Sequence, residues 1–200
     1  MKPAKTIEKL RSKTSVTIVA LGDSLTYGWM VDTGYLDFLK DMMGKKFPEK
    51  EFNLVNRGIP GDTAEGGLHR LERDVLELNP DCVFVQFALN DAFSGYSPED
   101  FKGNVRMIIE RIREKSTPDI VLITSVCLMD GYQDDLIGTY YDKLDELARE
   151  FRLPIAKVHE YWKSKISEDV TFGDLTLHDL AHPNSEGYRL MAEAIMELFA

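Results

Sequence analysis

A serine at position 24 stands in the segment ALGDSLTYG, residues 20–28. A serine hydroxyl acts as a nucleophile when a neighbouring base removes its proton and a carboxylate orients that base. The segment lacks the G-x-S-x-G pattern of the common hydrolase elbow, because Thr26 stands where the second glycine would be. Ser24 is therefore either a nucleophile in a different kind of turn or a serine that caps a helix after a buried strand.

Four histidines are candidates for the base. His69 falls inside a predicted helix, and His159 ends a predicted strand without a carboxylate placed to steer it, so we expect structural roles for both. His178 and His182 flank Asp179 in the segment LHDLAHPN. An aspartate three residues before a histidine on an irregular loop can turn its carboxylate onto the ring Nδ1, which leaves Nε2 for the serine. His182 is the predicted base, Asp179 orients it, and the role of His178 is left open.

Three groups are candidates for the hydrogen bonds that stabilise an oxyanion. They are the backbone N–H of Ser24, the backbone N–H of Gly61 in NRGIPGDT, and the side-chain amide of Asn90 in ALND. Gly61 allows a substrate to approach the backbone closely. Taken singly, a glycine after a proline is more often a turn residue, and an asparagine is more often part of an Asx turn. Their shared position, each after a predicted strand, favours a common site.

Five strand-like runs precede these residues. The runs are SVTIVALG (15–22), FNLVNRG (52–58), CVFVQFAL (82–89), IVLITSVCL (120–128) and PIAKVHE (154–160). Their apolar residues are continuous, as is typical of parallel strands that are covered on both faces. Amphipathic helical segments lie between them, so the sequence predicts a doubly wound three-layer α/β sandwich with a five-stranded parallel sheet. Ligands of such sheets bind where the carboxyl ends of the strands meet.

The composition narrows the partners and the location. With 200 residues and 44% hydrophobic content, we expect one domain over residues 1–200, with residues 1–14 as an N-terminal extension or short helix. The formal net charge of −10 disfavours nucleic acid and anionic membrane surfaces. We expect no signal peptide and no membrane span. Cys82 and Cys127 lie in apolar runs, which favours free thiols and a cytoplasmic location. A homo-oligomer is left open.

The segments GDSL, NRGIPGDT, ALND and DLAHPN follow one another between residues 22 and 184. In this order they resemble the four motif blocks of the GDSL, or SGNH, hydrolases. The resemblance implies the SGNH hydrolase fold, a flavodoxin-like three-layer α/β/α sandwich. It also implies a serine esterase or acylhydrolase that cleaves carboxylic esters through an acyl-enzyme, without a metal or a cofactor. One departure concerns the third block, which commonly reads G-x-N-D, because Ala88 replaces the glycine.

The resemblance assigns roles to the candidate residues. It implies Ser24 as the nucleophile, His182 as the base and Asp179 as the acid that orients it. The same match implies that Ser24 N–H, Gly61 N–H and Asn90 Nδ2 donate to the oxyanion. Candidate pocket residues are those that neighbour the motifs and the aromatic residues close to them, namely Asp23, Tyr27, Trp29, Asp91 and Phe93.

The expected substrate is a small-molecule acyl ester with a short acyl chain. A long chain needs a continuous apolar trough, and the loops after the strands are rich in Gly, Asp and Ser instead. The segment that contains Trp29, Met30 and Val31 is the counter-argument, because these side chains could form an apolar rim.

Four alternatives stay open at this point. Two belong to the same family: a carbohydrate O-acetylesterase, and a thioesterase or lysophospholipase. The third is a flavodoxin-like binding module without chemistry. The fourth is a metallohydrolase in which Asp23, Asn90, Asp179 and His182 serve as ligands.

Overall fold

The computed structural model describes residues 1–12 and 15–200, so residues 13 and 14 of the predicted N-terminal extension lie outside the described residues. The strands are β1 (Val16–Gly22), β2 (Phe52–Gly58), β3 (Cys82–Gln86), β4 (Asp119–Ile123) and β5 (Ile155–Ala156). The α-helices are α1 (Ala4–Arg11), α2 (Ser24–Tyr27), α3 (Tyr35–Lys46), α4 (Ala64–His69), α5 (Leu71–Asp74), α6 (Leu89–Phe93), α7 (Pro98–Lys115), α8 (Gly131–Phe151), α9 (Val158–Lys165) and α10 (Ser185–Met196). Short 3₁₀ turns are η1 (Leu76–Leu78), η2 (Phe172–Asp174) and η3 (Glu197–Phe199).

The five strands form one parallel sheet in the order β2-β1-β3-β4-β5. This confirms the predicted doubly wound fold. The chain leaves β1 toward β2 on one side and then builds β3, β4 and β5 on the other. The strand order therefore reverses between β1 and β3, and the crevice for a ligand opens there, at the carboxyl ends of these two strands.

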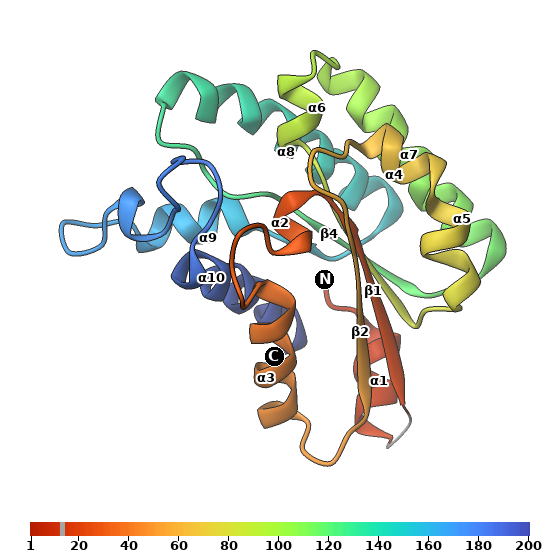
Figure 1. Cartoon of the computed structure of the whole chain (residues 1–200). Helices are drawn as coiled ribbons and strands as arrows, with labels where there is room; N and C mark the ends of the chain where they lie inside the picture. The colour runs from red at the N-terminus through yellow and green to blue at the C-terminus, as the bar shows by residue number, and fades with distance from the viewer. Residues whose placement is uncertain (13–14) are drawn as a thin grey trace.

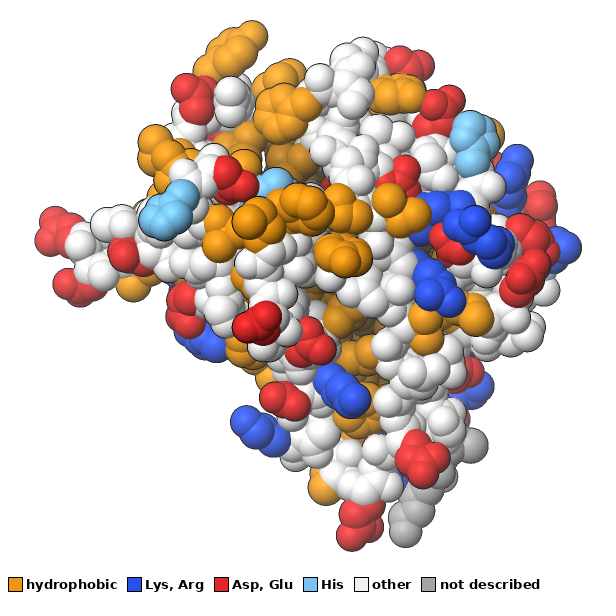
Figure 2. Space-filling model, in the orientation of Figure 1, with side chains coloured by type: hydrophobic (Ala, Val, Ile, Leu, Met, Phe, Trp, Pro, Cys, Tyr) orange, Lys and Arg blue, Asp and Glu red, His pale blue; other side chains and the backbone are white. Residues whose placement is uncertain are grey.

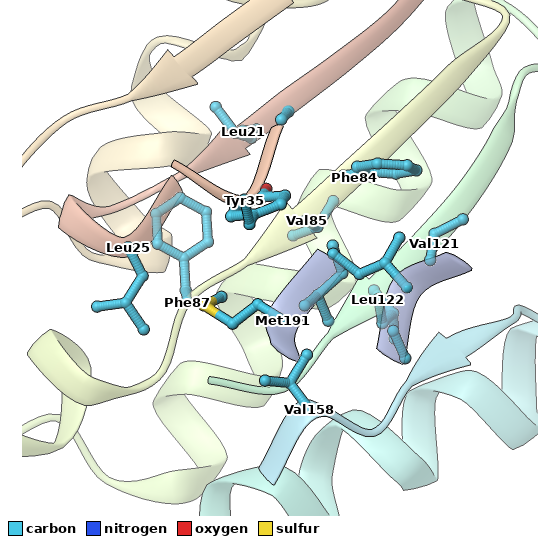
Figure 3. Close-up of a cluster of buried hydrophobic side chains, with 14 of the residues drawn as sticks. Leu21, Leu25, Tyr35, Phe84, Val85, Phe87, Val121, Leu122, Val158 and Met191 are labelled. Carbon is cyan, nitrogen blue, oxygen red and sulfur yellow. The ribbon is translucent and has the colours of Figure 1, made fainter. Parts of the chain in front are cut away.

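Helices cover both faces of the sheet (Figure 1). On one face α10 packs against both α3 and α9, and on the other α7 packs against both α4 and α8. The two sets of helices explain why the strands are continuously apolar, because each strand is buried from both sides. Figure 3 shows this core, in which Leu21 of β1, Phe84 of β3 and Leu122 of β4 lie among side chains from the helices, such as Met191 of α10.

The carboxyl ends of β1 and β2 lie very close to each other. A Cβ atom on Gly58, the last residue of β2, would lie 2.2 Å from the backbone nitrogen of Tyr27. Only glycine fits such a contact between two backbones. The short helix α2, which begins with Ser24, is therefore pressed against the end of β2.

Three strands are shorter than the apolar runs that predict them. β4 ends at Ile123, yet residues 124–127 remain buried, and the Tyr141 hydroxyl donates a hydrogen bond to the Val126 carbonyl at 3.0 Å. β5 pairs with β4 over two residues only, and His159 lies in α9 rather than at the end of a strand. An apolar run reports burial, and burial continues here after the strand pairing has ended.

β3 also ends early, at Gln86, because the backbone turns at Ala88. Ala88 is fully buried and has φ 141° and ψ −43°, a conformation that favours glycine. The residue that departs from the common motif thus keeps a glycine-like backbone despite its methyl group. Its strain is of the order of 1–3 kcal/mol.

Candidate active site

Ser24 lies immediately beyond β1, at the first position of α2. The N-cap of this helix is Asp23, whose carboxylate accepts the N–H of Leu25 at 2.9 Å. Ser24 is therefore not the capping residue, and its hydroxyl is available for another contact. Its side chain lies in a largely buried position, with the residue 6% exposed.

His182 and Asp179 meet Ser24 from the loop that precedes α10. The ring Nε2 of His182 lies 3.0 Å from Ser24 Oγ, and Nδ1 lies 2.7 Å from Asp179 Oδ2. The other carboxylate oxygen of Asp179 accepts the backbone N–H of His182 at 2.9 Å. Asn184 caps α10 and so fixes the end of this loop. The spacing of three residues between the two side chains produces the geometry that the sequence predicts for them.

The electrostatics of the loop keep Asp179 ionised. Partial burial pushes the pKa of Asp179 upward, but the N–H groups of His182 and Ala181 and the His182 ring outweigh it and lower the pKa. A carboxylate beside Nδ1 favours the tautomer that carries the proton on Nδ1. In this tautomer Nε2 is an acceptor, as the removal of a proton from Ser24 requires.

Gly61 lies in the turn after β2 and Asn90 lies in α6, and hydrogen bonds join these two segments to each other and to β1. Gly61 has φ 80° in a turn that is closed by the Asp62 N–H bond to Ile59 O, at 3.1 Å. Asn90 Nδ2 donates to the carbonyl of Asp62 at 2.9 Å. An amide NH₂ has two hydrogens, so this bond leaves one for a substrate. The Ile59 N–H donates in turn to Gly22 O, two residues before Ser24, at 3.0 Å.

Replacing Asn90 with alanine is expected to lower kcat by roughly 10²–10³ with little change in KM, because an oxyanion bond forms mainly in the transition state. Steady-state kinetics on a chromogenic ester measures both constants. Asn104, which lies in α7 and is not among the candidate site residues, offers a matched control as Asn104→Ala. A large rise in KM at unchanged kcat would show that Asn90 binds the substrate without stabilising the oxyanion.

The five candidate pocket residues divide into two groups. Tyr27 and Phe93 are exposed. The Trp29 ring centroid lies 6.4 Å from that of Tyr27 and 6.2 Å from that of His182, so Tyr27 and Trp29 lie beside the His182 ring. Asp23 and Asp91 are fully buried, and their carboxylates accept the backbone N–H of Leu25 in α2, at 2.9 Å, and of Ala64 in α4, at 3.0 Å. Burial raises the pKa of Asp23 to about 7 and that of Asp91 to about 6.

The remaining histidines lie outside this cluster. His69 and His178 are exposed. The expectation that His159 lacks a suitable carboxylate is wrong, because its Nε2 lies 2.9 Å from Asp134 Oδ1. Asp134 comes from α8, 25 positions earlier, and also pairs with Lys163 at 2.8 Å. A pair formed between two helices has no local spacing that a sequence pattern can reveal.

Sequence reasoning also missed polar residues that support the site. Gln86 in β3 accepts the Thr26 hydroxyl at 2.8 Å and donates to Ser125 Oγ at 2.8 Å, and so ties α2 to the segment after β4. A buried glutamine inside the apolar run CVFVQFAL was the available signal, because buried amides need partners. Arg70, in the connection between α4 and α5, gives no such signal.

The serine, histidine and aspartate are linked in the order found in serine hydrolases, at the carboxyl edge of a flavodoxin-like sheet. The chain belongs to the GDSL-like Lipase/Acylhydrolase family, whose sequence model matches residues 20–190. It is accordingly a carboxylic ester hydrolase. Among the described residues, no group of three or more His, Cys, Asp or Glu is placed to hold a metal ion, and no helix is long and apolar enough to cross a membrane.

Relatives of known activity align over most of the chain. An arylesterase of Vibrio mimicus is 22% identical over 188 residues, which cover 93% of this chain and 89% of the relative. The thioesterase 1/protease 1/lysophospholipase L1 of Escherichia coli K12 is 24% identical, with 92% and 83% covered. A crystal structure of a mutant of Axe2, an acetylxylan esterase from Geobacillus stearothermophilus, superposes with a TM-score of 0.84 at 18% identity, covering 94% of this chain and 96% of that one. This last likeness establishes the fold.

Proposed function

We propose that the enzyme is a serine esterase that hydrolyses carboxylic esters through a Ser24–His182–Asp179 triad. One observation carries the proposal: His182 Nε2 lies 3.0 Å from Ser24 Oγ while its Nδ1 lies 2.7 Å from Asp179 Oδ2. These contacts allow one ring to take a proton from the serine while the carboxylate stabilises the charge that the ring acquires.

The reaction proceeds in two halves on the same residues. Ser24 Oγ attacks the ester carbonyl as its proton moves to His182 Nε2, and the oxyanion accepts bonds from Ser24 N–H, Gly61 N–H and Asn90 Nδ2. The tetrahedral intermediate collapses as His182 gives its proton to the leaving alcohol, and an acyl-enzyme remains. Water then attacks the acyl carbon as His182 takes its proton, and the acid leaves as Ser24 is regenerated.

We further propose that the preferred acyl groups are short, from acetyl to about butyryl, because the loops around Ser24 are mainly polar. The experiment is the dependence of kcat/KM on chain length for p-nitrophenyl esters of two to twelve carbons. We expect a maximum within the first four carbons. Acetylated sugars and acyl thioesters, assayed in parallel, separate this reading from a carbohydrate O-acetylesterase and from a thioesterase.

One observation favours a second candidate, an esterase of longer acyl chains. Figure 2 shows hydrophobic side chains gathered across the upper part of the molecule, where the loops after the strands lie. Exposed apolar residues of the loops and short helices that follow the strands are Tyr27, Met30, Ile59, Phe93, Met129 and Leu180. Each methylene that such a surface buries contributes about 0.8 kcal/mol, or nearly fourfold in kcat/KM. A kcat/KM that keeps rising beyond eight carbons would establish this candidate and overturn the short-chain preference.

The location is part of the same proposal. Cys82 and Cys127 are both buried and free, as is typical of proteins in a reducing compartment. We propose a single catalytic domain that acts in the cytoplasm on small esters. The buried thiols support the location, and the acidic net charge of −10 disfavours nucleic acid as a partner.

A further inference from the structure

Arg70 is a largely buried cation close to the candidate active site. Its side chain is 9% exposed. Nε donates to Asp62 Oδ2 at 2.7 Å, and Nη1 donates to Asp74 Oδ2 at 3.0 Å. A buried guanidinium is tolerated when carboxylates pair with it and its donors are satisfied. Asp62 and Asp74 provide this pairing, so the ionic group is held in one place.

The same guanidinium also binds the ends of two strands. Nη1 donates to the carbonyl of Arg57, near the end of β2, at 2.8 Å. Nη2 donates to the carbonyl of Gly22, the last residue of β1, at 3.0 Å. A planar fork of five N–H donors can reach several acceptors in fixed directions, and a lysine ammonium cannot reproduce these directions. Arg70 therefore joins β1, β2 and the loop of Asp62 through one rigid group.

The groups that Arg70 joins are those that carry the three oxyanion donors. Gly22 lies two residues before Ser24, and Asp62 is adjacent to Gly61. The carbonyl of Asp62 accepts the side-chain amide of Asn90 at 2.9 Å. A displacement of the guanidinium would thus move all three donors relative to one another.

We propose that Arg70 is a positioning residue for the oxyanion hole. It holds the end of β1 and the Asp62 loop in a fixed position relative to each other. The role rests on the proposed serine esterase mechanism, because it matters only if these donors stabilise an oxyanion. Arg70 does not touch the substrate. It acts through Asp62 and Gly22, and its effect belongs to the transition state, since the oxyanion forms there.

Arg70→Lys tests the role while it keeps the positive charge between Asp62 and Asp74. We expect kcat to fall by about 10- to 100-fold with KM changed by less than about twofold, since small misplacements of catalytic groups have effects of this size. The control is Arg73→Lys. Arg73 pairs with the same Asp74 carboxylate at 2.6 Å, but its side chain is 71% exposed. We expect this variant to keep both constants.

Asp62→Asn tests the same contact from its other partner. The substitution replaces the carboxylate that accepts the Arg70 Nε hydrogen bond with a neutral amide. If Arg70 acts through Asp62, the double variant should be no less active than the more impaired of the two single variants. Losses that multiply would overturn the role through Asp62. Each assay is run well below the melting temperature of the variant. An Arg70→Lys enzyme with wild-type kcat, or one whose defect is a rise in KM alone, would overturn the positioning role.

The rate at which a fluorophosphonate labels Ser24 separates this inference from the proposed mechanism. Phosphonylation develops charge on an oxygen that the same donors hold, so we expect Arg70→Lys to be labelled more slowly than wild type and Arg73→Lys at the wild-type rate. If wild type is not labelled at Ser24, the serine mechanism fails. If wild type and Arg70→Lys are labelled equally fast, only the positioning role of Arg70 fails.

Discussion

Ser24→Ala is expected to lower ester turnover by a factor of about 10⁶ and to leave the protein folded. In the proposed mechanism Ser24 Oγ attacks the carbonyl, and alanine lacks this atom. His182 Nε2, 3.0 Å from Ser24 Oγ in the structure, would then have no hydroxyl to deprotonate. The backbone contacts of α2 remain, including the cap by Asp23 on Leu25 N. The measurement is kcat for p-nitrophenyl acetate, with a thermal melt of the same sample.

Mass spectrometry after organophosphate treatment locates the nucleophile independently. The adduct should lie on Ser24 in wild type and disappear in Ser24→Ala, while Ser94→Ala, a substitution of an exposed serine at the end of α6, serves as the control. An adduct on Ser94, Ser125 or Ser185 would contradict the assignment. A folded wild-type protein that takes no label would favour a binding module instead. Activity that survives a chelator but ends with labelling of Ser24 argues against a metallohydrolase.

The parallel sheet was predictable because each of its strands is buried on both faces. Helices such as α10 and α7 cover the two sides of the sheet, so the strands appear in the sequence as uninterrupted apolar runs. The same signal does not show where pairing ends. Residues 124–127 are buried without belonging to a strand, and β5 has only two residues. Burial is visible in a sequence, whereas the hydrogen-bond partner of a backbone group is not.

The site was predictable to the extent that it depends on strand ends or on local spacing. Asp179 and His182 are three residues apart, and their bond depends on one loop. Ser24 lies 158 positions from His182, yet the two meet because both loops lie at the carboxyl edge of the sheet. Long side chains that cross between elements follow neither rule. Arg70 reaches three elements, and nothing in the segment GGLHRLERDV distinguishes it from an exposed arginine.

Ala88 shows a different limit of the sequence. The departure from the common motif is visible, but its consequence depends on a backbone angle. The structure keeps φ at 141° for a residue with a Cβ atom, so the turn that leads into Asn90 is strained at Ala88. The bond from Asn90 Nδ2 to Asp62 O is formed nevertheless, at 2.9 Å. The packing that surrounds the turn outweighs the local preference of alanine.

His182→Ala is expected to reduce kcat by about as much as loss of the nucleophile, near 10⁶, because the serine and its base act as one unit. His178→Ala is expected to change kcat by less than about threefold. Both histidines flank Asp179, but only the His182 ring lies between its carboxylate, at 2.7 Å, and Ser24 Oγ, at 3.0 Å. The His178 side chain is exposed.

Comparing His178→Ala with His182→Ala decides which histidine is the base. The two residues lie four positions apart on the same loop, so a general disturbance of the loop would affect both variants. Steady-state kinetics on one ester gives the ranking, and thermal melts show whether the loop and α10 keep their packing. His182→Ala retains Asp179 and its bond to the backbone N–H of residue 182, so the loop should remain in place. If His178→Ala were the inactive variant, the base would be His178. The Asp179–His182 contact would then be structural, a clamp that closes the loop before Asn184 caps α10.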